Sequence, residues 1–305
     1  MRILVTGGAG FVGRNLVPLL KHNIKKTLMS LPHLKRCGLL SFLDAQKAHP
    51  HTKVCGFRKL SDIKVFSRTH GEIKGDLKNY KDVKRATKNI DAIIHLANSE
   101  NYRENTEFIR NIIRTGKENK VKKIIFISSM AAKRSFPDEY GKSKLEAEKM
   151  LKESGLNYTI LRPSLIYGKG SMGFKRIENL MKKIPFFTPI IGTGKYKIMP
   201  VHIKDVVKSI ENCIKNKKTD RKEYDVVGDS IYFIDLINFI KKEKNIKRIN
   251  VHIPVRILNI FSCLAPKIIS KKRIRNLTQD TKADINNRKE LGYGPIKFED
   301  FKNEE

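Results

Sequence analysis

Tyr140 and Lys144 are the side chains of this sequence best suited to transfer a proton. Residues four positions apart on a helix lie on the same face, so the two side chains would be neighbours. An ammonium group beside a phenol favours the phenolate and would lower the pKa of Tyr140 towards neutral pH. Ser128 and Ser129 end the preceding apolar run, where a hydroxyl can bind the same substrate oxygen. The alternative is an incidental exposed pair, because Tyr-x-x-x-Lys alone is a common pattern.

A glycine-rich turn near the start of the chain predicts a nucleotide site. Segment 6–13, Thr-Gly-Gly-Ala-Gly-Phe-Val-Gly, follows a short apolar run and precedes a periodic apolar stretch. Gly7 permits the tight turn, Gly10 lets the backbone approach a pyrophosphate, and Gly13 allows close packing of helix and strand. Free amides at the start of the helix would face the phosphate charge. The context of strand, turn and helix therefore favours a dinucleotide site over an ordinary turn.

The elements that must position these residues follow from the hydrophobic pattern. Strand-like and helix-like segments alternate through the first half of the chain, which predicts an α/β fold with a Rossmann-type doubly wound parallel sheet. Segments 174–181 and 234–240 have helical periodicity and belong to a smaller lobe. We expect an NAD(P)-binding domain at 1–165 and a substrate-binding lobe at 166–305, partly interleaved with it. A chain of 305 residues that is 40% hydrophobic is long enough for both.

The order of these motifs resembles that of the extended short-chain dehydrogenase/reductase superfamily, in particular its NAD(P)-dependent epimerase/dehydratase family. Segments 75–77, 90–97, 161–168, 199–207 and 291–295 match further parts of the family pattern, so the resemblance covers nearly the whole chain. It implies an oxidoreductase or epimerase that acts on a nucleotide-activated sugar by hydride transfer. A dehydratase is disfavoured, because no acidic residue directly follows the catalytic serine of the pattern.

The resemblance also implies roles for individual residues. Tyr140 would be the general acid/base, Lys144 its partner and a ligand of the nicotinamide ribose, and Ser129 the donor to the substrate oxygen. Ser129, rather than Ser128, holds the position that matches the family. Arg162 and His202 would lie near the substrate, and the alternative is that both are structural. The positions implied to contact the cofactor are Gly7, Gly10, Phe11, Val12, Gly13, Arg68, Asp76, Leu77, Ala97, Lys144 and Pro163.

The choice of cofactor depends on the end of the second strand, which we place at 63–66. Arg68 follows it, and an arginine there can pair with the 2′-phosphate of NADP, whereas an acidic residue would bind the 2′-hydroxyl of NAD. The alternative is that Arg68 merely belongs to a very basic surface. We therefore favour NADP(H), with NAD(H) as the alternative.

Segment 22–62 is the main anomaly, because the first helix should lead to the second strand within a few residues. We interpret it as an inserted surface loop, which a fold tolerates at a small cost in loop entropy. Cys37, Cys55, Cys213 and Cys263 have no Cys-x-x-Cys spacing and predict neither a disulfide framework nor a metal site. The cysteines and the lack of a leader or spanning segment indicate a cytoplasmic protein.

The charge balance favours anionic partners. Lys and Arg number 63 against 31 Asp and Glu, a formal net charge of +32. The lysines are spread along the chain with no nucleic-acid motif, so nucleic acid is a disfavoured partner. Segment 254–275 places apolar residues beside a basic cluster. It predicts either a helix of the substrate lobe or peripheral contact with an anionic membrane.

A second hypothesis is a structural or weakly catalytic NADPH-binding protein. The short gap between Ser129 and Tyr140 resembles the accessory respiratory complex I subunit of this fold. Retention of Tyr140 together with Lys144 argues for chemistry instead. The resemblance also implies a homodimer formed through the helix that carries Tyr140 and the helix before it.

Overall fold

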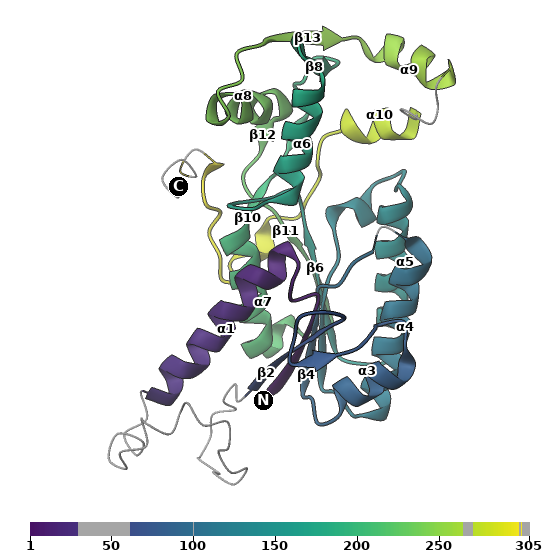
Figure 1. Cartoon of the computed structure of the whole chain (residues 1–305), viewed down its shortest axis with the longest axis vertical. Helices are drawn as coiled ribbons and strands as arrows, with labels where there is room; N and C mark the ends of the chain where they lie inside the picture. Colours follow the sequence, from purple (N-terminus) through teal and green to yellow (C-terminus); the bar gives the residue numbers. More distant parts are fainter. Residues whose placement is uncertain (30–61, 100, 265–270, 299, 301–305) are drawn as a thin grey trace.

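The computed structural model describes residues 1–29, 62–99, 101–264, 271–298 and 300. A parallel sheet flanked by helices carries a smaller lobe, which lies at the top of Figure 1. The α/β class and the doubly wound parallel sheet predicted from the sequence are confirmed.

The central sheet has the strand order β11-β6-β5-β4-β1-β2-β3, and each adjacent pair is parallel. From β1 the chain builds the sheet in one direction to β3 and then resumes on the other side of β1 with β4. A crevice forms at such a reversal, beyond the carboxyl ends of the strands. The strands are β1 (Arg2–Thr6), β2 (Asp62–Ser67), β3 (Ile73–Lys74), β4 (Ala92–His95), β5 (Lys123–Ile127), β6 (Tyr158–Pro163) and β11 (Lys222–Val226).

The strands contribute side chains to two hydrophobic cores, because successive side chains point to opposite faces of the sheet. In β5, Ile125 and Ile127 lie in one core, whereas Ile124 and Phe126 lie in the other. Burial on both faces explains why the strands read as nearly continuous apolar runs. The first core is covered by α1 (Phe11–Met29) and α7 (Ile203–Lys215), and the second by α3 (Tyr80–Thr87), α4 (Tyr102–Glu118) and α5 (Glu139–Glu153).

The smaller lobe has its own core, formed by Met181, Ile190, Leu236, Ile237 and Ile240. Strand β8 pairs with β13 in parallel, and β9 pairs with β12 antiparallel. Strands β7 (Ile166–Tyr167) and β10 (Val201–His202) pair where the lobe joins the sheet domain. The other elements of the lobe are α6 (Met172–Lys183), β8 (Phe187–Ile191), β9 (Lys197–Ile198), β12 (Ile231–Tyr232), α8 (Phe233–Glu243), β13 (Ile249–Ile253), α9 (Val255–Leu264) and α10 (Lys271–Leu277).

The chain passes between lobe and sheet domain more than once. After β9 it returns to the sheet domain as α7 and β11, and after α10 it returns again. Leu291 is fully buried in the core beneath α1 and α7. The hydroxyl of Tyr293 donates to the carbonyl of Val227 and accepts from its amide, each at 3.1 Å. The short 3-10 helices η3 (Lys217–Thr219) and η4 (Asn286–Arg288) lie along this path, and η2 (Met130–Lys133) lies between β5 and α5.

Helix α1 continues beyond residue 22, where the start of an insertion was expected from the sequence. Leu16, Leu20 and Ile24 are spaced by one helical turn and pack on the same core, so the helix gains burial by continuing. The side-chain amide of Asn23 donates to Glu211 of α7 at 3.0 Å. The assignment of residues 22–29 to an inserted loop was therefore wrong. Residues 30–61 lie outside the described residues.

Two of the four cysteines lie in the described part of the chain. Cys213 is buried and Cys263 exposed, and both are free thiols. Burial raises the pKa of the Cys213 thiol to about 12. Cys37 and Cys55 lie outside the described residues. No helix in the described ranges has the length and apolar character needed to cross a bilayer. No cluster of three or more His, Cys, Asp or Glu side chains there could hold a metal ion.

We predict that Leu16→Ala lowers the free energy of unfolding by about 2–5 kcal/mol, because it leaves a cavity in the core beneath α1. Leu19 is 38% exposed on the same helix and provides the matched control. Leu19→Ala should cost less than about 1 kcal/mol. Urea denaturation of both variants measures the difference. Equal losses would show that α1 does not depend on its buried face.

Candidate active site

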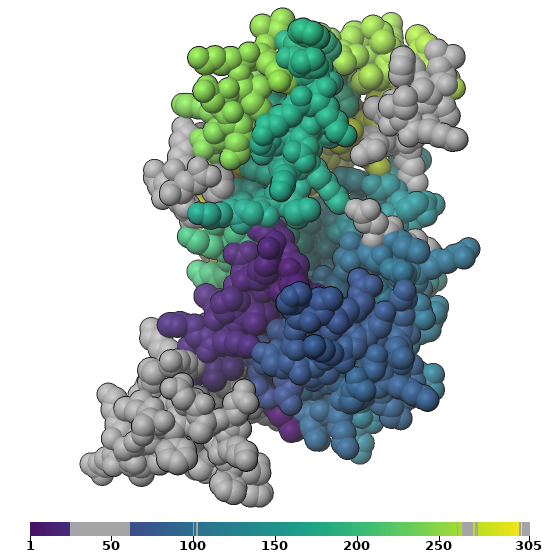
Figure 2. All heavy atoms as spheres, in the orientation of Figure 1, coloured from purple at the N-terminus to yellow at the C-terminus, as the bar shows by residue number. Residues whose placement is uncertain are grey.

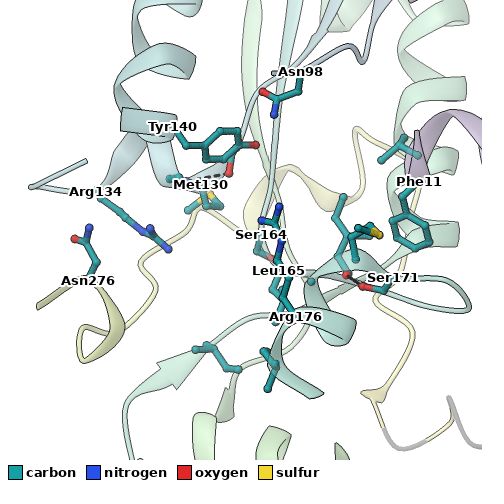
Figure 3. Close-up of a pocket in the computed structure, with 18 of the residues that line it drawn as sticks. Phe11, Asn98, Met130, Arg134, Tyr140, Ser164, Leu165, Ser171, Arg176 and Asn276 are labelled. Carbon is teal, nitrogen blue, oxygen red and sulfur yellow. Dashed lines mark hydrogen bonds between the residues drawn. The ribbon is translucent and has the colours of Figure 1, made fainter. Parts of the chain in front are cut away.

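A cavity of about 1980 Å³ lies at the carboxyl edge of the sheet, beneath the smaller lobe. Figure 2 shows the surface recessed where the lobe meets the sheet domain, and Figure 3 shows the side chains of the cavity wall. The glycine turn after β1, the ends of β2, β4 and β5, the start of α5 and much of α6 contribute to the wall. Because ligand pockets commonly measure about 300–1,000 Å³, this cavity has room for more than one small molecule.

The glycine turn has the geometry that a dinucleotide pyrophosphate requires. Gly7 has a φ of +74°, and a Cβ atom there would lie 2.5 Å from the backbone nitrogen of Ala97. A Cβ atom on Gly13 would lie 2.5 Å from the Cα atom of Gly8. Helix α1 begins at Phe11, directly beside the cavity, so its first amides can face an anion there. The residues present therefore fit a dinucleotide cofactor.

Most residues implied to contact the cofactor line this cavity. Asp76 and Leu77 follow β3, and Arg68 follows β2 at the adjacent strand end. Lys144 and Pro163 are not part of its wall: both are buried, and Ser164 lines the cavity instead of Pro163. The implied contacts that line the cavity are Gly7, Gly10, Phe11, Val12, Gly13, Arg68, Asp76, Leu77 and Ala97.

Tyr140 and Ser129 meet at the cavity wall. Tyr140 stands in the first turn of α5, where the side chain of the N-cap Asp138 accepts from the amide of Gly141 at 2.9 Å. The Tyr140 side chain is 38% exposed, and in Figure 3 it extends into the cavity. Partial burial in the wall raises the pKa of its phenol above the usual value, and a hydrogen bond with Ser129 acts in the opposite direction.

Lys144 does not behave as the sequence predicted. Its ammonium group is buried beneath Tyr140, donates to the carbonyl of Ile127 at 3.0 Å, and lies 5.8 Å from the centre of the Tyr140 ring. Burial lowers the pKa of Lys144 to about 8, although the carboxylate of Glu148 favours its charged form. The expected lowering of the Tyr140 pKa is therefore absent. Burial raises the pKa of the phenol, and the Lys144 ammonium donates to a backbone carbonyl instead.

Arg162 is held in a buried ionic network and does not line the cavity. Its guanidinium donates to Glu148 of α5 at 2.8 Å and 2.5 Å, and also pairs with Glu223 of β11. The hydroxyl of Ser128 donates to the same Glu148 carboxylate. The structure therefore favours the structural alternative for Arg162, because the guanidinium joins helix α5 to strands β6 and β11.

His202 also does not line the cavity. It is 1% exposed, and its side chain accepts from the amide of Lys204 at 3.3 Å, which caps the start of α7. Its ring packs edge-on against Tyr167 at 5.0 Å. These contacts give His202 a structural place at the junction of the lobes, which agrees with the structural alternative.

His95, a residue not predicted from the sequence, is buried at the end of β4, within electrostatic reach of Lys144. Its Nδ1 atom lies 2.7 Å from the hydroxyl of Thr6, and its ring stacks on Phe126. Burial, together with the charge of Lys144, lowers the pKa of His95 to about 3. The imidazole is therefore neutral at physiological pH.

Further residues of the cavity wall were not predicted from the sequence. Figure 3 shows Arg134 and Asn276 on the side of Tyr140, with Arg176 and Ser164 nearer the middle of the view. Ser164 could have been found, because it directly follows Pro163 in a segment that matched the family. Arg134 and Arg176 could not, because nothing in a chain with 63 basic residues separates them from solvated ones.

Comparison with known proteins agrees with this geometry. A family model described as NAD(P)H-binding matches residues 41–183. The N-acetyl-alpha-D-glucosaminyl-diphospho-ditrans,octacis-undecaprenol 4-epimerase of Escherichia coli O157:H7 is 26% identical over 285 residues, which cover 83% of this chain and 75% of the relative. The solved structure of UDP-glucose 4-epimerase from Thermotoga maritima, with UDP-glucose, has a TM-score of 0.65 and 19% identity and covers 97% of this chain and 94% of the other.

A mitochondrial relative belongs to the same comparison. NADH dehydrogenase [ubiquinone] 1 alpha subcomplex subunit 9 of Dictyostelium discoideum is 25% identical over 245 residues, which cover 76% of this chain. The match spans 62% of that subunit, so this chain corresponds to less than two thirds of its length.

The fold is that of solved sugar-nucleotide epimerases and dehydratases, and residues 41–183 match an NAD(P)H-binding domain. The chain is thus an NAD(P)-binding α/β protein that is similar to sugar 4-epimerases of Escherichia coli O157:H7 and Vibrio cholerae.

We predict that Gly7→Ala weakens the binding of NADPH by at least about tenfold, or about 1.4 kcal/mol, because the new methyl group collides with Ala97. Gly155 supplies the matched control: its φ is +75°, and no atom lies within 4 Å of the point that a Cβ atom would occupy there. Both alanine variants carry the same left-handed backbone strain, of about 1–2 kcal/mol. Titration followed by nicotinamide fluorescence compares them. Equal affinities would refute a steric role for Gly7.

We predict that His95 makes the protein less stable as the pH falls from 6.5 towards 3. The folded state keeps the imidazole neutral, with a pKa of about 3, whereas the unfolded chain protonates near 6.5. The unfolded state thus binds one more proton in this window, which lowers the free energy of unfolding by about 1.4 kcal/mol per pH unit. His95→Gln should flatten the measured slope by this amount between pH 4 and 6. Parallel slopes for the two proteins would contradict the assignment.

Proposed function

We propose that this chain is an NAD(P)-dependent oxidoreductase or epimerase that acts on a hydroxyl group of a nucleotide-activated sugar. The observation that carries the proposal is the meeting of Tyr140 and Ser129 at the wall of a cavity that the glycine turn also lines. Relatives whose names include sugar 4-epimerases, in Escherichia coli O157:H7 and Vibrio cholerae, support it.

The proposed chemistry divides between the protein and the cofactor. A bound nicotinamide supplies or accepts the hydride. Tyr140 takes the proton of the substrate hydroxyl as that carbon is oxidised and returns it when the carbonyl is reduced. Ser129 donates a hydrogen bond to the same oxygen and holds it beside the phenol. The raised pKa of Tyr140 suits the return step, since a neutral phenol is the proton donor.

Two basic side chains near Tyr140 favour its deprotonated form, which takes the proton of the substrate hydroxyl. Arg134 and Arg176 both line the cavity, and each favours the phenolate form of Tyr140 electrostatically. Their positive charge also suits the phosphate groups of a nucleotide-activated sugar. Lys144 lies buried beneath the Tyr140 ring, where burial lowers its pKa to about 8, and we propose that its ammonium binds the nicotinamide ribose.

We propose NADP(H) as the cofactor. Ser67 and Arg68 line the cavity at the end of β2, where a 2′-phosphate would lie. The alternative, NAD(H), would place the 2′-hydroxyl of its ribose at the same point.

A structural NADPH-binding role is the second candidate function. It is favoured by the similarity to the mitochondrial NADH dehydrogenase subunit of Dictyostelium discoideum. In this case the cofactor would stabilise the fold, and Tyr140 would not turn over a substrate.

Two proposals concern partners. Ile257 and Ile260 of α9 are 55% and 65% exposed, which supports peripheral contact of segment 254–275 with an anionic membrane. Helices α4 and α5 pack against each other along the outer face, where a homodimer would form. Co-flotation with anionic vesicles tests the first proposal, and the mass in solution tests the second.

We predict that Tyr140→Phe lowers kcat by about 100- to 10,000-fold and leaves NADPH affinity unchanged, because it removes the proton-transfer group alone. A panel of UDP- and dTDP-sugars, followed by nicotinamide absorbance and product identity, measures the effect. Tyr232→Phe is the matched control, since Tyr232 is 44% exposed at the start of α8, outside the cavity.

The results separate the two candidate functions. Turnover that is lost in Tyr140→Phe and kept in Tyr232→Phe supports the enzyme. Tight binding of NADPH without turnover of any sugar in the panel favours the structural role. Turnover that survives in Tyr140→Phe would remove Tyr140 from the proposed mechanism.

A further inference from the structure

The half of the cavity inside the smaller lobe has a different chemical character from the half beside the glycine turn. Apolar side chains from four elements of the lobe form its wall, and we call this region the apolar groove. It is defined by Met172, Ile177 and Leu180 of α6, Pro189 of β8, Leu236 of α8 and Leu258 of α9.

Several apolar side chains of the cavity are left in contact with solvent. Met172 is 54% exposed, Leu180 is 60% exposed, and Leu277 of α10 is 37% exposed, although all three line the same hollow. Exposed apolar surface gathered in a concave region typically marks a binding site for an apolar ligand. We therefore expect the apolar groove to bind an apolar ligand.

Polar groups line the cavity on the side of Tyr140. Arg134 lies there, and α10 adjoins it, because the side-chain amide of Asn276 in α10 donates to the carbonyl of Phe136 at 2.9 Å. Figure 3 shows Asn276 and Arg134 together on this side of the cavity. Arg176 of α6 lines the same cavity and acts electrostatically on Tyr140. Positive charge thus lies between the reacting centre and the apolar groove.

This order of chemistry constrains the ligand. A nucleoside carries ring nitrogens, carbonyls and ribose hydroxyls, and their burial against Met, Leu and Ile side chains would leave them without hydrogen-bond partners. A hydrocarbon chain has no such groups and gains free energy from the same contacts. Tyr140 and the apolar groove line one cavity, so one substrate molecule can reach from the reacting centre into the groove.

We propose that the apolar groove binds a hydrocarbon chain of the substrate, which a phosphate ester near Arg134 and Arg176 joins to the reacting sugar. This proposal rests on the Tyr140 chemistry and the sugar substrate proposed above, and it replaces the nucleotide: the carrier of the sugar is a lipid phosphate. The sugar would lie at Tyr140, the phosphate beside the two arginines, and the chain along α6 and α8.

A series of n-alkyl phosphates with eight, ten and twelve carbons tests the proposal on the full chain. Isothermal titration below the critical micelle concentration gives the affinities, with inorganic phosphate as the reference. Each methylene that enters the groove should tighten binding by about fourfold. An affinity that does not change with chain length would overturn the proposal.

Variants locate the bound chain. Met172→Gln and Leu180→Gln should each weaken the binding of the twelve-carbon phosphate by at least about tenfold, because they place an amide in the groove. The affinity for inorganic phosphate should not change. Phe186→Gln is the matched control: Phe186 is 82% exposed on the same lobe and lies outside the cavity. If Phe186→Gln weakens binding as much as Leu180→Gln does, the chain adsorbs to the lobe surface and the groove assignment is wrong.

Competition separates this inference from the proposed function. Dodecyl phosphate should displace any sugar nucleotide that binds, and UDP-N-acetylglucosamine should be at least about tenfold weaker as a ligand. A UDP-sugar that turns over and resists dodecyl phosphate would overturn the lipid carrier and leave the enzyme proposal standing. If alkyl phosphates bind in the groove but neither NADPH nor NADH binds the protein, the lipid site stands and the enzyme proposal is overturned.

Discussion

The parallel pairing of β1 with both β2 and β4 is the constraint from which the rest of the structure follows. Parallel strands bring all their carboxyl ends to one edge, so the segments after them converge on one cavity. The close approach of Gly7 to Ala97 occurs where β1 and β4 end together. A side chain at Gly7 would push these two strand ends apart, and the phosphate site would be lost with them.

A second constraint lies beneath the candidate catalytic residues. Glu148 and Arg162 are largely buried charges, and their pairing, together with that of Arg162 and Glu223, fixes α5 against β6 and β11. Removal of one partner would leave an unpaired buried charge, which costs much more than the loss of a surface ion pair. The position of Tyr140 at the start of α5 therefore depends on ionic contacts between residues that do not line the cavity.

Local chemistry decided how much of the site could be predicted from the sequence. The glycine turn and the Ser129, Tyr140 and Lys144 pattern depend on spacing along one or two elements, and the sequence contains that spacing. The places of Arg162 and Arg176 depend on which distant residues fold beside them. Arg162 pairs with Glu148 and Glu223, and no local pattern distinguishes it from a ligand. The spacing of Leu16, Leu20 and Ile24 indicates that α1 continues beyond residue 22. The unusual length of the segment before the second strand led to the prediction of an insertion instead.

The position of β11 has a consequence for how the chain acquires its fold. This strand, Lys222–Val226, pairs with β6, yet most of the smaller lobe's first elements are synthesised between the two. Until a ribosome has released β11, the exposed edge of β6 has no partner on that side. Contacts between residues so distant in sequence slow folding. We therefore expect the sheet and the lobe to form in one late, cooperative step, with no independent intermediate in which either is complete.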